Sequence, residues 1–190
     1  MTRIFLAAGE ASGDLQASLL VRALRARRDD LEFAGVGSTR MEEAGVRLVA
    51  RSEEVAVVGI LEVLERLPRI LGALERTRCA LGSWRPDLFV PVDFPDFNFR
   101  LLPRASRLGI PVVYYISPQI WAWRPERVWT LRRHLRRMVT IFPFEAELYR
   151  QAGIPVSWVG HPLVDRIAPA GSPAAERGKL GLDAAGPAVA

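Results

Sequence analysis

The fold is decided by residues 3–28, which read RIFLAAGEASGDLQASLLVRALRARR. The apolar run at residues 3–8 is typical of a buried strand. The leucines and alanines after it recur at helical spacing, and Ser12 or Asp14 can cap a helix that we expect to end near Arg28. A strand that leads directly into an amphipathic helix is the repeating unit of a parallel sheet.

Strands and helices alternate along the rest of the chain. Apolar runs predict further strands at residues 31–36, 46–50, 87–92, 111–116, 138–142 and 155–159. Helical spacing predicts helices at residues 39–44, 97–108, 125–136, 144–152 and 60–84, the last interrupted or bent at Pro68. This alternation predicts an α/β fold, in which a mostly parallel sheet is covered by helices on both faces.

The last part of the chain has a different composition. Residues 168–187 are rich in Ala, Gly and Pro, as a linker is, and residues 188–190 resemble the opening of another strand. We therefore expect one domain at residues 1–167, followed in residues 168–190 by a linker and the start of a truncated C-terminal domain. A chain of 190 residues is long enough for such a domain to bury a hydrophobic core.

Charge and cysteine content narrow the class of protein. The chain carries 26 Lys and Arg against 21 Asp and Glu, and its net charge of +5 favours an anionic partner, such as a nucleic acid, a phosphorylated substrate or an anionic lipid. The single cysteine excludes a disulfide framework and fits a reducing cytoplasm. The first residues do not read as a signal peptide, and no apolar stretch approaches the roughly 20 residues of a membrane span.

Three loops are expected at the carboxyl ends of strands, where parallel sheets bind ligands. The first, residues 9–14, combines two glycines with Glu10 at the start of a helix. Free N–H groups there can bind an anion, although a tight turn with a helix cap explains the same residues. The Gly-x-Gly-x-x-Gly spacing is missing, which disfavours a nucleotide-dependent oxidoreductase.

The second loop, residues 93–98, follows directly on a strand. Asp93 has no obvious capping duty, so it is the better candidate for a general base. Asp96 stands just before a predicted helix, where an N-cap is the simpler explanation. The mixture of polar and aromatic side chains in this segment suits a ligand of the size of a sugar.

The third loop, residues 117–124, carries Trp121 and Trp123. Their rings can stack on a sugar or on acyl chains, or they can fill the end of the sheet. Arginines continue from this loop into the next helix, where they form either a solvated face or a basic surface for phosphates: Arg124, Arg127, Arg132, Arg133, Arg136 and Arg137. A lone His161 before a proline is more often structural than catalytic.

Residues 60–74 carry an apolar stripe at helical spacing, with arginines nearby. Its members are Ile60, Val63, Leu64, Leu67, Ile70, Leu71 and Leu74. Such a stripe usually packs against a core. A basic amphipathic helix can instead lie in a membrane interface, and the sequence leaves both interpretations open.

Taken together, the motifs resemble those of lipid-A-disaccharide synthases. They follow the family's order along nearly the whole chain: GEASGD at 9–14, VGILEVL at 58–64, DFPDFN at 93–98, YISPQIWAWR at 115–124, FPFE at 142–145 and GHP at 160–162. The resemblance implies a GT-B architecture, with two Rossmann-like domains and the active site in the cleft between them. This chain then corresponds to the N-terminal, acceptor-side half.

The resemblance also implies a reaction. A 2,3-diacylglucosamine unit passes from its UDP derivative to 2,3-diacylglucosamine 1-phosphate, with inversion, without a metal and without a cofactor. The implied catalytic residues are Asp93 and Glu10. The implied substrate-binding residues are Ser12, Gly13, Asp96, Asn98, Ser117, Trp121, Trp123, Arg124 and His161.

The resemblance places this reaction at the cytoplasmic face of the inner membrane, since both substrates carry acyl chains. We therefore expect an anionic membrane surface, and no nucleic acid, as a partner, with contacts from Leu64, Arg66, Leu67, Arg69 and Leu71. In such families the C-terminal domain supplies most of the UDP contacts, so we expect the chain alone to be inactive. The alternative is a non-catalytic lipid- or membrane-binding module.

Overall fold

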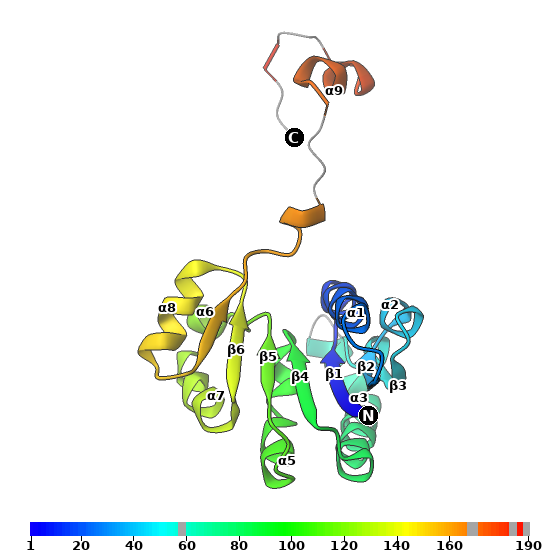
Figure 1. The fold of residues 1–190 in the computed structure, drawn as a ribbon, viewed down its shortest axis with the longest axis vertical. Helices are drawn as coiled ribbons and strands as arrows, with labels where there is room; N and C mark the ends of the chain where they lie inside the picture. The colour runs from blue at the N-terminus through cyan, green and yellow to red at the C-terminus, as the bar shows by residue number, and fades with distance from the viewer. Residues whose placement is uncertain (57–59, 167–170, 183–185, 188–190) are drawn as a thin grey trace. The chain divides into compact units, whose positions relative to one another are not determined.

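The sheet contains seven parallel strands in the order β3-β2-β1-β4-β5-β6-β7. The structure is a computed structural model that describes residues 1–56, 60–166, 171–182 and 186–187, with side chains except at 60–65, 166 and 173. Figure 1 shows the strands lying side by side. Their bounds are β1 Thr2–Ala8, β2 Leu31–Gly37, β3 Arg47–Arg51, β4 Leu88–Val92, β5 Val113–Tyr115, β6 Arg137–Thr140 and β7 Val156–Trp158. The predicted α/β class is confirmed, and the strand order is that of a Rossmann-like sheet with one added strand.

Helices connect the strands, as the alternating pattern predicts. Their bounds are α1 Ala11–Arg25, α2 Thr39–Glu43, α3 Ile60–Trp84, α4 Pro95–Asn98, α5 Leu102–Arg107, α6 Ile120–Trp123, α7 Val128–His134, α8 Pro143–Gln151 and α9 Pro173–Lys179. Short 3₁₀ turns lie at η1 Ser52–Glu54, η2 Pro125–Arg127 and η3 Val164–Arg166. None of the described helices has the length and apolarity needed to cross a bilayer.

Prolines explain two differences from the expected helices. The predicted helix 97–108 is two helices, because Pro95 and Pro103 each stand in the first turn of a separate one. Of the two predicted effects of Pro68, an interruption is wrong, since α3 continues through this residue, while a bend stays a prediction. Pro68 is exposed, so water can take over the carbonyl that loses its helical partner.

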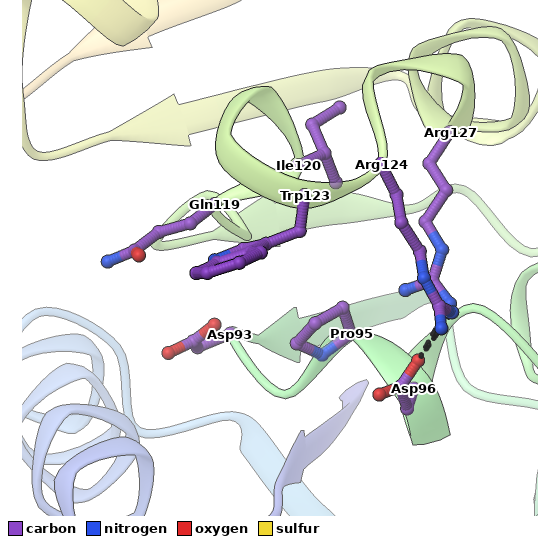
Figure 2. A pocket seen from close by; sticks show the side chains of 8 residues that line it. All are labelled: Asp93, Pro95, Asp96, Gln119, Ile120, Trp123, Arg124 and Arg127. Carbon is purple, nitrogen blue, oxygen red and sulfur yellow. Dashed lines mark hydrogen bonds and ion pairs between the residues drawn. The ribbon is translucent and has the colours of Figure 1, made fainter.

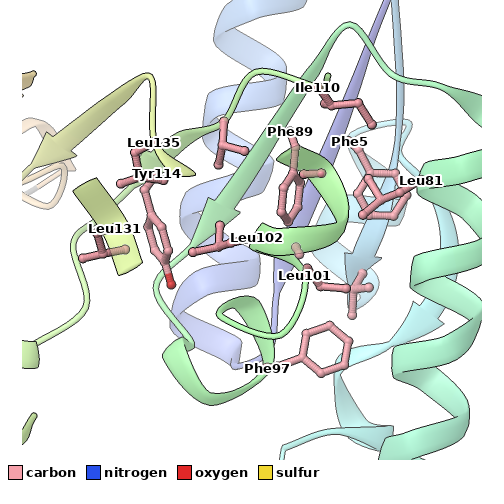
Figure 3. Close-up of a cluster of buried hydrophobic side chains, with 14 of the residues drawn as sticks. Phe5, Leu81, Phe89, Phe97, Leu101, Leu102, Ile110, Tyr114, Leu131 and Leu135 are labelled. Atoms are coloured by element: carbon pink, nitrogen blue, oxygen red, sulfur yellow. The ribbon is translucent and has the colours of Figure 1, made fainter. Parts of the chain in front are cut away.

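Helices cover both faces of the sheet, and β1 shows this most clearly. Ile4, Leu6 and Ala8 belong to one buried cluster, with Val21 of α1 and Met41 of α2. The residues that alternate with them, Phe5 and Ala7, belong to a second cluster with side chains of α3 and α5, among them Leu81 and Leu102 (Figure 3). Since successive side chains of a strand point to opposite faces, the two clusters are the cores of the two faces.

Asp14 links α1 to α2. Its carboxylate accepts hydrogen bonds from the backbone N–H groups of Ser38 (2.6 Å), Arg40 (3.1 Å) and Met41 (3.2 Å), and it is buried. The expectation that Ser12 or Asp14 caps α1 is therefore wrong, because both lie inside its first turn. Asp14 instead satisfies the free N–H groups at the start of α2.

The chain divides into two compact units, Met1–Gly160 and His161–Ala190. The first unit holds the whole sheet. The described part of the second contains η3 and α9, which Ser172 caps by accepting a hydrogen bond from the N–H of Ala175 at 3.3 Å. The interpretation of residues 168–190 as a linker and the start of another domain stays a prediction.

Candidate functional site

The candidate site lies where the strand order reverses, between β1 and β4. In open α/β sheets, ligands bind outside the carboxyl ends of strands at this point. Gly9 and Glu10 follow β1, and Asp93 follows its neighbour β4. The two loops touch: a Cβ at Gly9 would lie 2.1 Å from the ring of Phe94, so a larger residue here would force this ring to move.

The Asp93 loop has an unusual backbone held by several hydrogen bonds. Asp93 and Phe94 both have positive φ angles, 45° and 47°. The N–H of Asp93 donates to the carbonyls of Tyr115 and Ile116, at 3.2 Å each. Backbone conformations of this kind cost free energy and persist where surrounding contacts fix them, which is common at functional sites.

Two buried side chains hold the Asp93 carbonyl. Tyr114 donates its hydroxyl to this oxygen at 2.6 Å, and Asn98 donates its amide at 2.8 Å. Asn98 also donates to the carbonyl of Ala7 at 3.1 Å, which joins the loops after β4 and β1. Burial raises the pKa of Tyr114 well above its ordinary value, so the hydroxyl keeps the proton that it donates.

Asn98 was predicted to bind substrate, whereas in the structure its side chain supports the Asp93 loop. It is fully buried and positions the loop, so it has no surface through which to contact a substrate. Gly13 is also buried, on the sheet side of α1, and its contact with substrate stays a prediction. A Cβ at Gly13 would lie 3.3 Å from that of Ala8, so the glycine permits close packing of helix and strand.

The carboxyl group of Asp93 holds its proton more tightly than an ordinary aspartate. Burial, and then the negative charge of Glu10, raise the pKa of Asp93 to about 6, with a further contribution from Glu145. A hydrogen bond from the N–H of Phe94 acts in the opposite direction. A carboxylate with a pKa near neutral pH is suited to accept a proton in general base catalysis.

We expect Glu10→Gln and Glu145→Gln each to lower the pKa of Asp93 toward its ordinary value, with the larger effect from Glu10. Each change removes a negative charge that opposes ionisation of Asp93. Because Glu10 is exposed and Glu145 is buried, salt should weaken the first effect more than the second. The measurement is an NMR titration of the Asp93 carboxyl carbon at low and high salt.

The matched control for this titration is Glu147→Gln. Glu147 lies on α8 like Glu145, but it is exposed and pairs with Arg150. Its replacement should leave the Asp93 titration unchanged. An unchanged Asp93 pKa in both the Glu10 and Glu145 variants would contradict the electrostatic explanation.

A hollow of about 460 Å³ opens beside Asp93. Figure 2 shows its lining, in which Trp123 faces Asp93 and Pro95. The full lining is Asp93, Pro95, Asp96, Gln119, Ile120, Trp123, Arg124 and Arg127. The volume lies within the range typical of small-molecule sites.

Asp96 does not cap a helix, so the simpler interpretation of this residue is wrong. The N-cap of α4 is Phe94, and Asp96 lies inside the first turn. Its carboxylate instead pairs with Arg127 at 2.7 Å and with Arg124 at 3.5 Å. The structure thus brings Asp96 and Arg124, two of the predicted substrate-binding residues, to one wall of the hollow.

The two tryptophans of the third loop have different surroundings. Trp123 is 83% exposed and lines the hollow, so its ring is available for stacking. Trp121 packs edge-on against Phe144, with ring centroids 5.3 Å apart.

Ser117 is buried at the end of β5, and exposed Ser12 lies in the first turn of α1. His161 begins the second unit, and its part in substrate binding stays a prediction.

The apolar stripe of α3 divides between the core and the surface. Leu74 is buried, whereas Leu67 and Leu71 are 40% and 46% exposed. Arg69 is exposed and Arg66 is half-buried, and the side chain of Leu64 lies outside the described residues. A second hollow of about 370 Å³ runs beside this helix, lined by Val55, Leu67, Ile70, Leu74, Phe94, Asp96, Phe97, Arg100 and Arg124.

The sequence of the chain matches the sequence model of the lipid-A-disaccharide synthetase family over residues 4–190. The chain belongs to this family. A lipid-A-disaccharide synthase of Myxococcus xanthus is 48% identical over 188 residues, which are 99% of this chain and 49% of that protein. One of Chromobacterium violaceum is 48% identical over 180 residues, 95% of this chain and 47% of that protein. The chain thus spans about half the length of the curated relatives it matches.

Solved structures confirm the GT-B type of fold for this member of the synthase family. MurG of Acinetobacter baumannii superposes with a TM-score of 0.51 at 13% identity, over 75% of this chain and 42% of that one. A UDP-N-acetylglucosamine 2-epimerase of Rickettsia bellii superposes with a TM-score of 0.58 at 15% identity, over 96% of this chain and 52% of that one. At such identities the similarity concerns the fold alone.

Two residues of this synthase-family site were not among the predicted ones. The sequence does not distinguish Arg127 from the five other arginines between residues 124 and 137. Only the structure shows that its side chain lines the hollow. Glu145 is buried in the first turn of α8, and its Oε2 has no hydrogen-bond partner among the described residues. In the sequence, only the FPFE motif at residues 142–145 indicated that Glu145 belongs near the site. Within the described residues, no cluster of His, Cys, Asp or Glu side chains is arranged to hold a metal ion.

Proposed function

We propose that this chain is the acceptor-side half of a lipid-A-disaccharide synthase. The whole enzyme transfers 2,3-diacylglucosamine from its UDP derivative to 2,3-diacylglucosamine 1-phosphate, with inversion and without a metal ion. The observation that carries the proposal is Asp93, a carboxylate with a pKa of about 6 that borders a hollow at the switch point of a synthase-family sheet.

Asp93 acts as the general base in this proposal. It takes the proton of the attacking hydroxyl group of the acceptor, whose oxygen forms a bond to the anomeric carbon of the donor. The bond from that carbon to the UDP oxygen breaks, and UDP leaves with the electron pair. A single displacement of this kind inverts the anomeric configuration. Glu10 raises the pKa of Asp93, which makes the base stronger once it is ionised.

The donor contacts belong, in this proposal, to the half of the enzyme that the chain does not span. Helix N-termini and arginine side chains there would stabilise the charge on the departing diphosphate. The hollow beside Asp93 then holds the acceptor sugar, with Trp123 stacked on its ring.

We also propose that α3 contacts the cytoplasmic face of the inner membrane, where acylated substrates are held. Leu67 and Leu71 are exposed one turn apart on one side of this helix, and Arg69 is also exposed but points to another side. A helix that presents both apolar side chains and arginines suits an interface with anionic lipid. A non-catalytic membrane-binding module would share this face, but it has no need of a base held in a strained loop.

The test is a chimera in which this chain replaces the matching half of the Myxococcus xanthus synthase, 48% identical over 188 residues. We expect the chimera to form the disaccharide 1-phosphate and UDP from the two proposed substrates, and the chain alone to form neither. The parental enzyme, assayed in parallel, is the control. A folded, membrane-binding chimera without transferase activity would favour the non-catalytic module.

A further inference from the structure

Two guanidinium groups converge on one carboxylate oxygen at the wall of the hollow. Oδ1 of Asp96 lies 2.7 Å from a nitrogen of Arg127 and 3.5 Å from a nitrogen of Arg124. Figure 2 shows both arginine side chains reaching down to Asp96. Paired arginines are a common arrangement for binding the oxygens of a phosphate.

Arg127 is fixed in this position before any ligand binds. Its guanidinium carbon lies 4.9 Å from the centre of the Phe99 ring, and its side chain is only 20% exposed. A planar cation stacked on an aromatic ring loses little conformational freedom when it binds an anion. Such preorganisation is what a binding group requires.

Asp96 is a weak partner for these two arginines. Its side chain is 75% exposed, and ion pairs in contact with water contribute little to stability. A phosphate monoester has up to two negative charges and three terminal oxygens, so it can satisfy both guanidinium groups better than one carboxylate oxygen can.

We propose that Arg124 and Arg127 bind the phosphate monoester of the acceptor sugar and that Asp96 competes with this phosphate for the same two groups. The inference rests on the proposed function, because it takes the acceptor to be a sugar 1-phosphate. In this arrangement the phosphate lies at the Arg127 end of the hollow, while Asp93 faces the attacking hydroxyl.

The neighbouring hollow supports a phosphate that belongs to a lipid. Asp96 and Arg124 line both hollows, so the ion pair stands between the polar one, with Asp93, and the one beside α3. The second is lined mainly by apolar side chains, among them Leu67 and Ile70. A sugar phosphate with acyl chains can therefore place its charged and apolar parts in adjoining spaces.

The test is an NMR titration of the 190-residue chain that follows the indole N–H of Trp123, which lines the same hollow. The probes are N-acetylglucosamine 1-phosphate, N-acetylglucosamine without the phosphate, and UDP, which represents the donor. We expect the sugar phosphate to bind more tightly than the sugar and to shift the Trp123 signal more than UDP does. The Trp123→Phe variant assigns the signal.

Arg127→Gln should weaken binding of the sugar phosphate by about tenfold or more, the effect of losing a charge-assisted hydrogen bond. Arg127→Lys, which keeps the charge but loses the planar fork, should weaken binding less. The matched control is Arg133→Gln on α7, an exposed arginine outside this hollow, which should have no such effect. Asp96→Asn should strengthen binding, because it removes the competing charge.

Three results would overturn the inference. The first is equal binding of N-acetylglucosamine 1-phosphate by the Arg127 and Arg133 variants. The second is weaker binding by Asp96→Asn, which would make Asp96 a direct ligand of the sugar. The third is a Trp123 response to UDP alone, which would assign the arginines to the donor. These binding results are independent of the chimera assay, so the proposed function can fail or hold separately.

Discussion

Asp93→Asn is expected to lower the turnover of the active chimera by about 100- to 10,000-fold, the range typical for loss of general base catalysis. Asparagine has the same shape but takes no proton from the attacking hydroxyl. The side chains of Tyr114 and Asn98 hold the loop by donating hydrogen bonds to the carbonyl of residue 93, and these bonds do not depend on the side chain of residue 93. The measurement is the rate of UDP release at saturating substrate.

The same variant should be more stable than the wild type above pH 6. The pKa of Asp93 is about 6 in the folded protein, above its ordinary value of about 4, so the folded state keeps a proton that the unfolded chain has released. Stability therefore falls as the pH rises between about 4 and 6. Asn removes this loss, which amounts to about 2–3 kcal/mol by linkage. Urea unfolding of the chain at pH 5 and pH 8 measures the difference.

A matched exposed variant, Asp29→Asn, should change neither turnover nor the pH dependence of stability. Turnover near that of the parental chimera in Asp93→Asn would remove Asp93 from the role of base. Loss of turnover together with a less stable protein at pH 8 would instead indicate that the variant damages the loop.

Local patterns in the sequence were sufficient for the class of fold. Period and residue type place strands and helices because these signals act over a few neighbouring residues, as at 3–28. The candidate base followed in the same way, since Asp93 directly follows a predicted strand and parallel strands end at one edge of the sheet.

Contacts between distant parts of the chain were not predictable in this way. Asp14 reads as a cap of its own helix, yet it accepts hydrogen bonds from residues 38, 40 and 41. Asn98 reads as a polar residue near a ligand, yet its amide joins the loops after β1 and β4. Short polar side chains can bond to any nearby backbone, so their roles depend on tertiary structure.

Replacing both Leu67 and Leu71 with Ser is expected to weaken binding of the chain to anionic vesicles by about 10- to 100-fold. Leu67 and Leu71 are 40% and 46% exposed, so roughly half of each side chain can leave water on binding. That contributes roughly 1 kcal/mol per leucine, and 2 kcal/mol corresponds to about 30-fold in affinity. Flotation with phosphatidylglycerol vesicles measures it, and replacing Arg69 with Gln should reduce binding further at low salt.

Leu74 provides the contrast that tests this surface assignment. It lies on the same helix, one turn beyond Ile70, but it is 3% exposed and belongs to the core. Leu74→Ala should therefore lower the free energy of unfolding by about 2–5 kcal/mol and leave vesicle binding per folded molecule unchanged. The Leu67 and Leu71 double variant should change that free energy by less than about 1 kcal/mol. If instead the double variant is destabilised as much as Leu74→Ala and still binds vesicles normally, the exposed leucines of α3 serve packing, and the proposed membrane contact is wrong.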